Sequence, residues 1–196
     1  MNPATAAFAG RLAVPAIVAP MFLVSGPDLV VECCRAGLAG TFPALNQRST
    51  AGFSDWLAEI GERCGPEAAP FGVNLIVHRS NPRLEADLAA VVAARVPLVI
   101  TSLGAVSDLV QAVHGYGGIV FHDVISRRHA EKAAEAGVDG IIAVSAGAGG
   151  HAGTLSPFAL IEEIRSVFDG AIILAGALTQ GGHILAAEAM GADFAY

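Results

Sequence analysis

The segment whose residue types and spacing point most clearly to chemistry runs from position 143 to 154 and reads AVSAGAGGHAGT. An apolar run there passes into glycines, among them Gly149 and Gly150, and a single imidazole, His151, follows. Glycine has no Cβ, so such a loop lets backbone N–H groups approach a ligand closely. An imidazole beside that ligand can move protons near neutral pH. A glycine-rich turn with an exposed histidine is the simpler alternative, but the position after an expected buried strand favours the functional interpretation.

A second segment of small residues ends another apolar run. Ala175, Gly176 and Ala177 close that run, and residues 178–182 lead into a helical pattern. Loops of this kind bind phosphate through backbone amides and the N-terminus of the following helix. Because main-chain donors make such a grip, no basic side chain is needed. The segment is a candidate phosphate site, with a purely structural turn as the alternative.

Other polar residues lie within or just after apolar runs. Asn74 lies inside one run, where a buried amide needs a partner, either a ligand or the neighbouring backbone. His122 and Asp123 end another run and indicate either an oriented imidazole or a satisfied core histidine. His78 and Arg79 would place positive charge near an anionic substrate or simply in solvent. No set of His, Cys, Asp or Glu has the spacing of metal ligands, so we expect no metal.

The elements that position these residues alternate regularly between apolar runs and helical patterns. Successive runs start 20 to 34 residues apart, as strand–helix–strand units require. Eight such units predict an α/β fold, a (β/α)8 TIM barrel, with its site at the C-terminal ends of the strands. An open doubly wound sheet is the alternative, and the lack of G-x-G-x-x-G after the first run counts against it. The runs are 15–21, 37–44, 71–77, 98–104, 118–124, 140–147, 171–177 and 193–196, and the helical patterns are 28–36, 54–64, 83–94, 107–114, 127–136, 157–168 and 180–190.

The eighth run begins at Asp193 and the sequence stops at Tyr196. A barrel needs this strand to pair on both sides, because an unpaired edge beside a buried sheet promotes aggregation. We therefore expect one domain over residues 1–196, truncated within the eighth strand, that belongs to a longer protein or has a partner that covers the gap.

Composition excludes several classes of function. The net charge is −7 with only 11 Lys and Arg, which argues against nucleic acid and anionic membranes as partners. The longest apolar run, 12–24, has 13 residues and two prolines, shorter than the roughly 18 residues of a membrane span. We interpret it as a core strand. The three cysteines fit neither a disulfide framework nor a zinc site, so we expect a cytoplasmic protein.

Several segments resemble, in their order and spacing, the nitronate monooxygenase family, formerly called 2-nitropropane dioxygenase. They are 15–21 (PAIVAPM), 72–75 (GVNL), 136–141 (AGVDGI), 149–153 (GGHAG) and 173–177 (ILAGA). The resemblance extends from about residue 12 to the last residue. The family has flavin-dependent relatives among NADH:quinone reductases and bacterial enoyl reductases. Each motif alone is weak, whereas the ordered set is fairly specific.

The resemblance implies an FMN-binding TIM barrel that oxidises nitronates or nitroalkanes with dioxygen. It makes His151 the catalytic base, which abstracts the acidic α-proton or binds the nitronate. Electrons then pass to FMN, and dioxygen reoxidises the flavin. The first-strand residues would contact the isoalloxazine, Asn74 would bond the flavin or substrate, and the 175–177 loop would hold the phosphate. The cofactor-binding residues implied are Pro20, Met21, Phe22, Asn74, Asp123, Gly149, Gly150, Ala175, Gly176 and Ala177.

The sequence also departs from the family pattern. Ala177 stands where members commonly have a second glycine, and Asp123 lies near a position that is basic in some relatives. The family continues after the eighth strand with a Gly-Thr phosphate loop and a smaller lid domain, so this chain alone is expected to bind FMN weakly, or not at all, unless those parts are supplied. A homo-oligomer is compatible with the sequence. Two alternatives remain: a nicotinamide-dependent quinone or enoyl reductase of the same superfamily, and a non-catalytic barrel fragment that binds a phosphorylated ligand or a partner chain.

Overall fold

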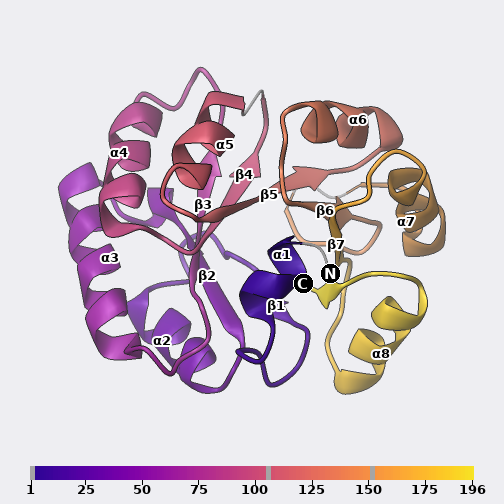
Figure 1. Ribbon diagram of the computed structural model, residues 1–196, viewed down its shortest axis with the longest axis horizontal. Coiled ribbons are helices and arrows are strands. Elements are labelled where there is room, and N and C mark those ends of the chain that lie inside the picture. The colour runs from indigo at the N-terminus through magenta and orange to yellow at the C-terminus, as the bar shows by residue number, and fades with distance from the viewer. Residues whose placement is uncertain (1–2, 105–106, 151–152) are drawn as a thin grey trace.

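The computed structural model describes residues 3–104, 107–150 and 153–196. In this part of the chain, eight parallel strands alternate with helices and form one sheet in the order β1 to β8. The strands lie at the centre and the helices surround them (Figure 1). The fold is the (β/α)8 TIM barrel that the alternating pattern predicts.

Each strand lies inside one of the expected apolar runs. The central strands are buried on both faces, which is why they form nearly continuous apolar runs in the sequence. The polar or small residues at the ends of the runs belong to the loops. The strands are β1 (Ile17–Val18), β2 (Ala39–Pro43), β3 (Gly72–Ile76), β4 (Leu98–Ser102), β5 (Ile119–Val124), β6 (Gly140–Val144), β7 (Ala171–Ala175) and β8 (Phe194–Ala195).

The helices also follow the expected patterns, with two additions. Neither the N-terminal helix α1 (Pro3–Phe8) nor the 3-10 helix η1 (Ala44–Asn46) was expected from the sequence. Helix α3 (Thr50–Cys64) begins four residues before the expected pattern of 54–64. The side chain of Ser49 caps it by accepting the N–H of Gly52 at 3.1 Å. Among the residues described, no helix combines the length and apolar character that a membrane span requires. The remaining helices are α2 (Pro27–Arg35), α3 (Thr50–Cys64), α4 (Leu84–Ala94), α5 (Ser107–His114), α6 (Arg127–Glu135), α7 (Pro157–Arg165) and α8 (Gly181–Ala189).

Two residues of β8 are enough to close the ring. On one side β8 pairs with β7, with Phe194 opposite Ile173. On the other side Ala195 forms a parallel bridge with Ala16, and its N–H donates to the carbonyl of Pro15 at 2.9 Å. The eighth strand therefore has hydrogen-bonded neighbours on both sides, and the unpaired edge expected there is absent from the described residues.

Alternation along the strands creates two apolar cores. Side chains on the outer face pack between the strands and the helices, whereas those on the inner face fill the barrel. The buried inner residues are Ile17, Ala39, Leu98, Ile100, Ile119, Phe121, Ile142, Ala171, Ile173, Ala175 and Phe194, with Phe8 of α1 added to them. The interior is a packed core rather than a pore, so ligands must bind at an end of the barrel.

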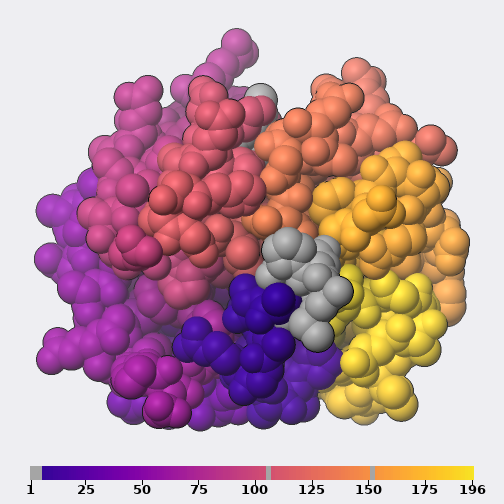
Figure 2. Space-filling view, in the orientation of Figure 1, coloured from indigo at the N-terminus to yellow at the C-terminus, as the bar shows by residue number. Residues whose placement is uncertain are grey.

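Helix α1 covers one end of this inner core. The ring centroid of Phe8 lies 5.4 Å from that of Phe194 and 6.2 Å from that of Phe121. Phe8 also lines a shallow pocket with Pro15 and Asp193, which precede β1 and β8. The N-terminal segment accordingly occupies the middle of the face shown in Figure 2. Since α1 closes the N-terminal ends of the strands, the opposite end, with the loops that follow the strands, remains for a ligand.

Candidate active site

The described residues expected to contact the cofactor all lie at the C-terminal ends of the strands. Asn74 and Asp123 are on the inner faces of β3 and β5, Ala175 is the last residue of β7, and the other residues are in loops. Residues 20–22 follow β1, residues 149–150 follow β6, and residues 175–177 end β7 and begin the next loop. Because the strands are parallel, these loops share one rim of the barrel. His151, the expected base, lies outside the described residues.

A chain of hydrogen bonds joins three neighbouring strands at this rim. The Asn74 amide donates from Nδ2 to Ser102 Oγ at 2.9 Å, with a longer 3.4 Å contact to the carbonyl of Ile100. The Ser102 hydroxyl in turn donates to Asp123 Oδ2 at 2.5 Å. Asn74 and Asp123, which the sequence places 49 positions apart, are thus connected through one serine. Asn74 therefore has partners within the protein, and its Oδ1, which has no hydrogen-bond partner among the described residues, could accept a hydrogen bond from a ligand.

The Asp123 carboxyl is only half satisfied. Its Oδ2 accepts the bond from Ser102, but Oδ1 is buried without a hydrogen-bond partner among the described residues. Burial raises the pKa of this carboxyl to about 6, although the bond from Ser102 acts in the opposite direction. Burial, and then the charge of Asp123, raise the pKa of the Tyr196 hydroxyl, so this tyrosine is its electrostatic neighbour.

The loops after β6 and β7 are tied together by Ser145. Its N–H and its hydroxyl both donate to the carbonyl of Ala175, at 2.9 and 2.8 Å. Gly176 lies against this serine with φ of 158°, and a Cβ there would be 2.2 Å from Ser145 Oγ. Only glycine fits that position. The backbone at the end of β7 is consequently held close to the loop that leads to His151.

Ala177 is a non-glycine residue in the left-handed region, with φ of 55°. A side chain is disfavoured there, so Ala177→Gly is expected to stabilise the fold by about 1 kcal/mol or less. Urea unfolding followed by circular dichroism measures the change. The matched control is Ala175→Gly, a buried position within β7, which is expected to destabilise. A stability loss in Ala177→Gly comparable to that of the control would contradict the assignment of strain to Ala177.

The loop after β1 is held by Asn46 of η1, a residue that the sequence analysis did not single out. Its Oδ1 accepts the N–H of Leu23 at 2.9 Å, and its Nδ2 donates to the carbonyls of Met21 and Ser25 at 3.0 and 2.8 Å. Because the backbone of the loop is fixed in this way, its apolar side chains point outward. Phe22 is 67% exposed, so its ring is available to a planar ligand.

His122 is a satisfied core histidine, one of the two alternatives left open by the sequence. It lies on the outer face of β5, and its Nδ1 is 2.7 Å from Thr101 Oγ1. Burial, and then the charge of His129 on α6, lower the pKa of His122 to about 4, which keeps its ring neutral. Adjacent residues of a strand face opposite ways, so His122 points toward the helices while Asp123 points into the barrel.

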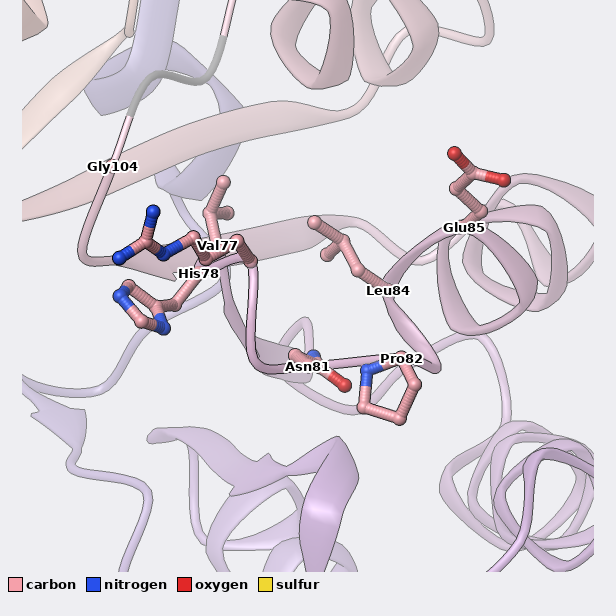
Figure 3. A pocket seen from close by; sticks show the side chains of 8 residues that line it. Val77, His78, Asn81, Pro82, Leu84, Glu85 and Gly104 are labelled. Carbon is pink, nitrogen blue, oxygen red and sulfur yellow. The ribbon is translucent and has the colours of Figure 1, made fainter.

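A pocket of about 660 Å³ lies between the loops that follow β3 and β4. His78 lies on one side of it, and Leu84 and Glu85 of α4 lie on the other (Figure 3). Arg79 also lines the pocket. His78 Nδ1 contacts Ser80 Oγ at 2.8 Å, and both His78 and Arg79 are exposed. The cationic pair noted in the sequence therefore lines a pocket at the same rim, where it can meet an anionic group.

Sequence reasoning missed three polar residues that organise the rim, namely Asn46, Ser102 and Ser145. Serine and asparagine near a strand end are common in loops, so residue type alone gave no signal. The spacing of two residues along the expected strands did, however, give a signal. Ser102 and Asp123 both occupy inward positions near the ends of neighbouring expected strands, and parallel neighbours bring such positions together.

Comparison with known proteins places this geometry in context. Residues 101–196, from β4 to β8, match the family model of FMN-dependent dehydrogenases. The chain is 26% identical to (3aS,4S,5R,7aS)-5-hydroxy-7a-methyl-1-oxo-octahydro-1H-indene-4-carboxyl-CoA dehydrogenase of Rhodococcus jostii, over 91% of this chain and 49% of that protein. It is also 26% identical to a nitronate monooxygenase of Neurospora crassa, over 90% of this chain and 57% of that protein. The chain thus spans about half the length of these curated relatives.

Solved structures share the fold. FabK from Thermotoga maritima matches 100% of this chain and 60% of its own, with a TM-score of 0.88 and 23% identity. Nitroalkane oxidase from Streptomyces ansochromogenes matches 96% of this chain and 66% of its own, with a TM-score of 0.85 and 23% identity. The barrel and the family match together support FMN as the cofactor of this chain.

The loop after β7 suits the phosphate of such a cofactor. The backbone N–H groups of Gly176, Ala177 and Leu178 donate to no other described residue. Main-chain donors in an irregular loop just before a helix form an anion-binding concavity. The lack of a Cβ at Gly176 keeps this backbone close to the neighbouring loop, so the residues present fit a phosphorylated group.

Proposed function

We propose that the chain is the FMN-binding barrel of an oxidoreductase that oxidises nitronates or nitroalkanes with dioxygen, with His151 as the base. The observation that carries this proposal is the gathering of the described candidate residues at one rim of a closed barrel. The match of residues 101–196 to FMN-dependent dehydrogenases supports the cofactor. The resemblance of the His151 segment to the nitronate monooxygenase family supports the base.

In this proposal, each group of residues has a separate task. The backbone N–H groups of Gly176, Ala177 and Leu178 hold the phosphate, while Gly149 and Gly150 let the backbone approach the ring. The exposed apolar side chains of Met21 and Phe22, with the half-buried Pro20, exclude water from one side of it. FMN, when bound, supplies the two-electron chemistry. His151 takes the α-proton of a neutral nitroalkane, and an already ionised nitronate binds without that step.

A nicotinamide-dependent reductase of a quinone or an enoyl thioester is the second candidate. The pocket lined by His78 and Arg79 favours it, because a reduced nicotinamide cofactor and a coenzyme A thioester both carry phosphates that a guanidinium binds well. In this alternative, the same barrel residues would hold FMN, and a reduced nicotinamide would supply the hydride. The two candidates thus share a cofactor and differ in the reductant.

Spectra of the chain mixed with FMN test the shared part of the proposal. We expect FMN to bind, seen as quenched flavin fluorescence, and we expect Gly176→Ala to weaken binding more than tenfold because its Cβ meets Ser145 Oγ. Gly61→Ala, a site on α3 with open space around it, is the matched control and is expected to leave binding unchanged. Failure of the native chain to bind FMN would instead support the non-catalytic barrel fragment.

Anaerobic reduction distinguishes the two enzymes. The FMN-loaded chain is mixed separately with a nitronate and with NADH, and flavin absorbance is followed by stopped flow. The leading proposal predicts bleaching by the nitronate and slow or no bleaching by NADH. Rapid bleaching by NADH, with no response to the nitronate, would overturn it in favour of the reductase.

A further inference from the structure

The hydrogen bonds from Asn74 to Asp123 have a fixed direction. An amide nitrogen only donates, so Ser102 Oγ accepts from Asn74 Nδ2 and must direct its own proton elsewhere. That proton goes to Asp123 Oδ2. The chain therefore ends on a carboxyl whose Oδ2 is occupied as an acceptor, and whose Oδ1 is buried and partnerless among the described residues.

No described cation compensates this carboxyl. The groups that face it from β3 and β4 are the neutral side chains of Asn74 and Ser102, and Tyr196, beyond β8, is the titratable group with which its charge interacts. The buried residues described inside the barrel are otherwise mainly apolar. A buried carboxylate with one donor and no countercharge is costly, and binding a proton is the usual way to remove that cost.

We propose that Asp123 holds a proton on Oδ1 and donates it in a hydrogen bond to an acceptor atom on the ring of the bound ligand. This inference rests on the proposed function, in which that ligand is FMN, whose ring carries carbonyl oxygens and nitrogens as acceptors. Asn74 Oδ1 would accept from a ring N–H beside it. While Asp123 is protonated, the pair thus offers one donor and one acceptor to a planar heterocycle, and Asp123 then acts as a positioning residue rather than a fixed negative charge.

The protonation of Asp123 can be measured without any flavin. In the flavin-free chain labelled with ¹³C at aspartate carboxyls, one resonance is expected to titrate near pH 6, and the Asp123→Asn variant is expected to lack it. Asp55→Asn, an exposed position on α3, is the control and should retain this resonance. Titration of the Asp123 carboxyl below about pH 4.5, close to an ordinary aspartate, would overturn the inference.

The FMN arm measures the donated hydrogen bond. The Asp123 carboxyl can donate below its pKa and cannot donate above it. The FMN dissociation constant of the native chain should therefore rise about tenfold between pH 5 and pH 8, compared with that of Asp123→Asn. The amide of this variant donates at both pH values. The phosphate of FMN also titrates at about pH 6. The phosphate and the histidines are the same in both chains, so their effects on FMN binding cancel in the comparison with Asp123→Asn. Asp123→Leu, which has no donor, should bind weakly at both pH values.

The outcomes separate the two ideas. Native and Asp123→Asn chains with the same pH profile for FMN would overturn the role of Asp123 while leaving FMN binding intact. A chain that binds no FMN at any pH, although its Asp123 carboxyl titrates near pH 6, would overturn the proposed function and its ligand together.

Discussion

Replacing His151 with asparagine is expected to lower kcat/KM for a neutral nitroalkane by about 10²–10⁴-fold, the usual contribution of a positioned general base. Asparagine keeps the approximate size and hydrogen-bonding capacity of the side chain but cannot take a proton. The same variant should lose less than about tenfold on the pre-ionised nitronate, because that substrate has no α-proton left to remove. Dioxygen consumption with each form of one nitroalkane measures the two values.

His129→Asn is the matched control for this experiment. His129 is exposed on α6, and its Nδ1 contacts only Ser126 Oγ among the described side chains. Both substrates should react at native rates in that variant. An equal loss on the nitroalkane and the nitronate in His151→Asn would mean that His151 binds the substrate and is not the base.

The Asp87→Ala variant is expected to lose about 3–5 kcal/mol of unfolding free energy, because it leaves a largely buried guanidinium without its partner. Asp87 is fully buried on α4, and its Oδ1 lies 3.0 Å from Arg83 Nη2. It also accepts the hydroxyl of Thr50 at 2.6 Å, which joins the start of α3 to α4. Guanidinium chloride unfolding measures the loss.

An exposed ion pair of the same spacing provides the control for Asp87. Arg127 and Glu131 are four residues apart on α6, and both side chains are about half exposed. Glu131→Ala should change the unfolding free energy by less than about 1 kcal/mol. A similarly small change in Asp87→Ala would show that the buried pair contributes no more than a surface one.

The pair matters to the rim as well as to stability. Arg83 also donates from Nη1 to the carbonyl of Gln47 at 2.6 Å. Gln47 directly follows Asn46, which fixes the loop after β1, and Arg83 lies just before α4, beside the pocket. Arg83, which Asp87 holds in place, thus connects the loop after β3 to the loop after β2.

The strands were predictable from the sequence because the strands of a parallel sheet that is covered on both faces are nearly continuous apolar runs. β6 (Gly140–Val144) and β7 (Ala171–Ala175) contain only apolar residues or glycine, and turn residues bound each run. Helix α1 has no such pattern. Its six residues are too few to show a helical period, and the contacts of Phe8 with the barrel core appear only in three dimensions.

The candidate site was only partly predictable, for a related reason. A glycine such as Gly176 indicates in the sequence that the backbone approaches a neighbour closely. The structure identifies that neighbour as Ser145 Oγ. The bond between Ser102 and Asp123 depends on the register between two strands, which the sequence does not state. The role of His122 was decided by the two-residue period of β5, which turns it away from Asp123.

The contact between Phe8 and Phe194 has a consequence for how the protein assembles during synthesis. Phe8 of α1 cannot make this contact until synthesis has reached Phe194, 186 residues later in the sequence. Local strand–helix pairs can form early. The contact between α1 and β8 joins segments that lie far apart in the sequence, so it forms after those pairs. A nascent chain stalled before Phe194 would therefore expose the apolar inner residues of an unclosed barrel to chaperones.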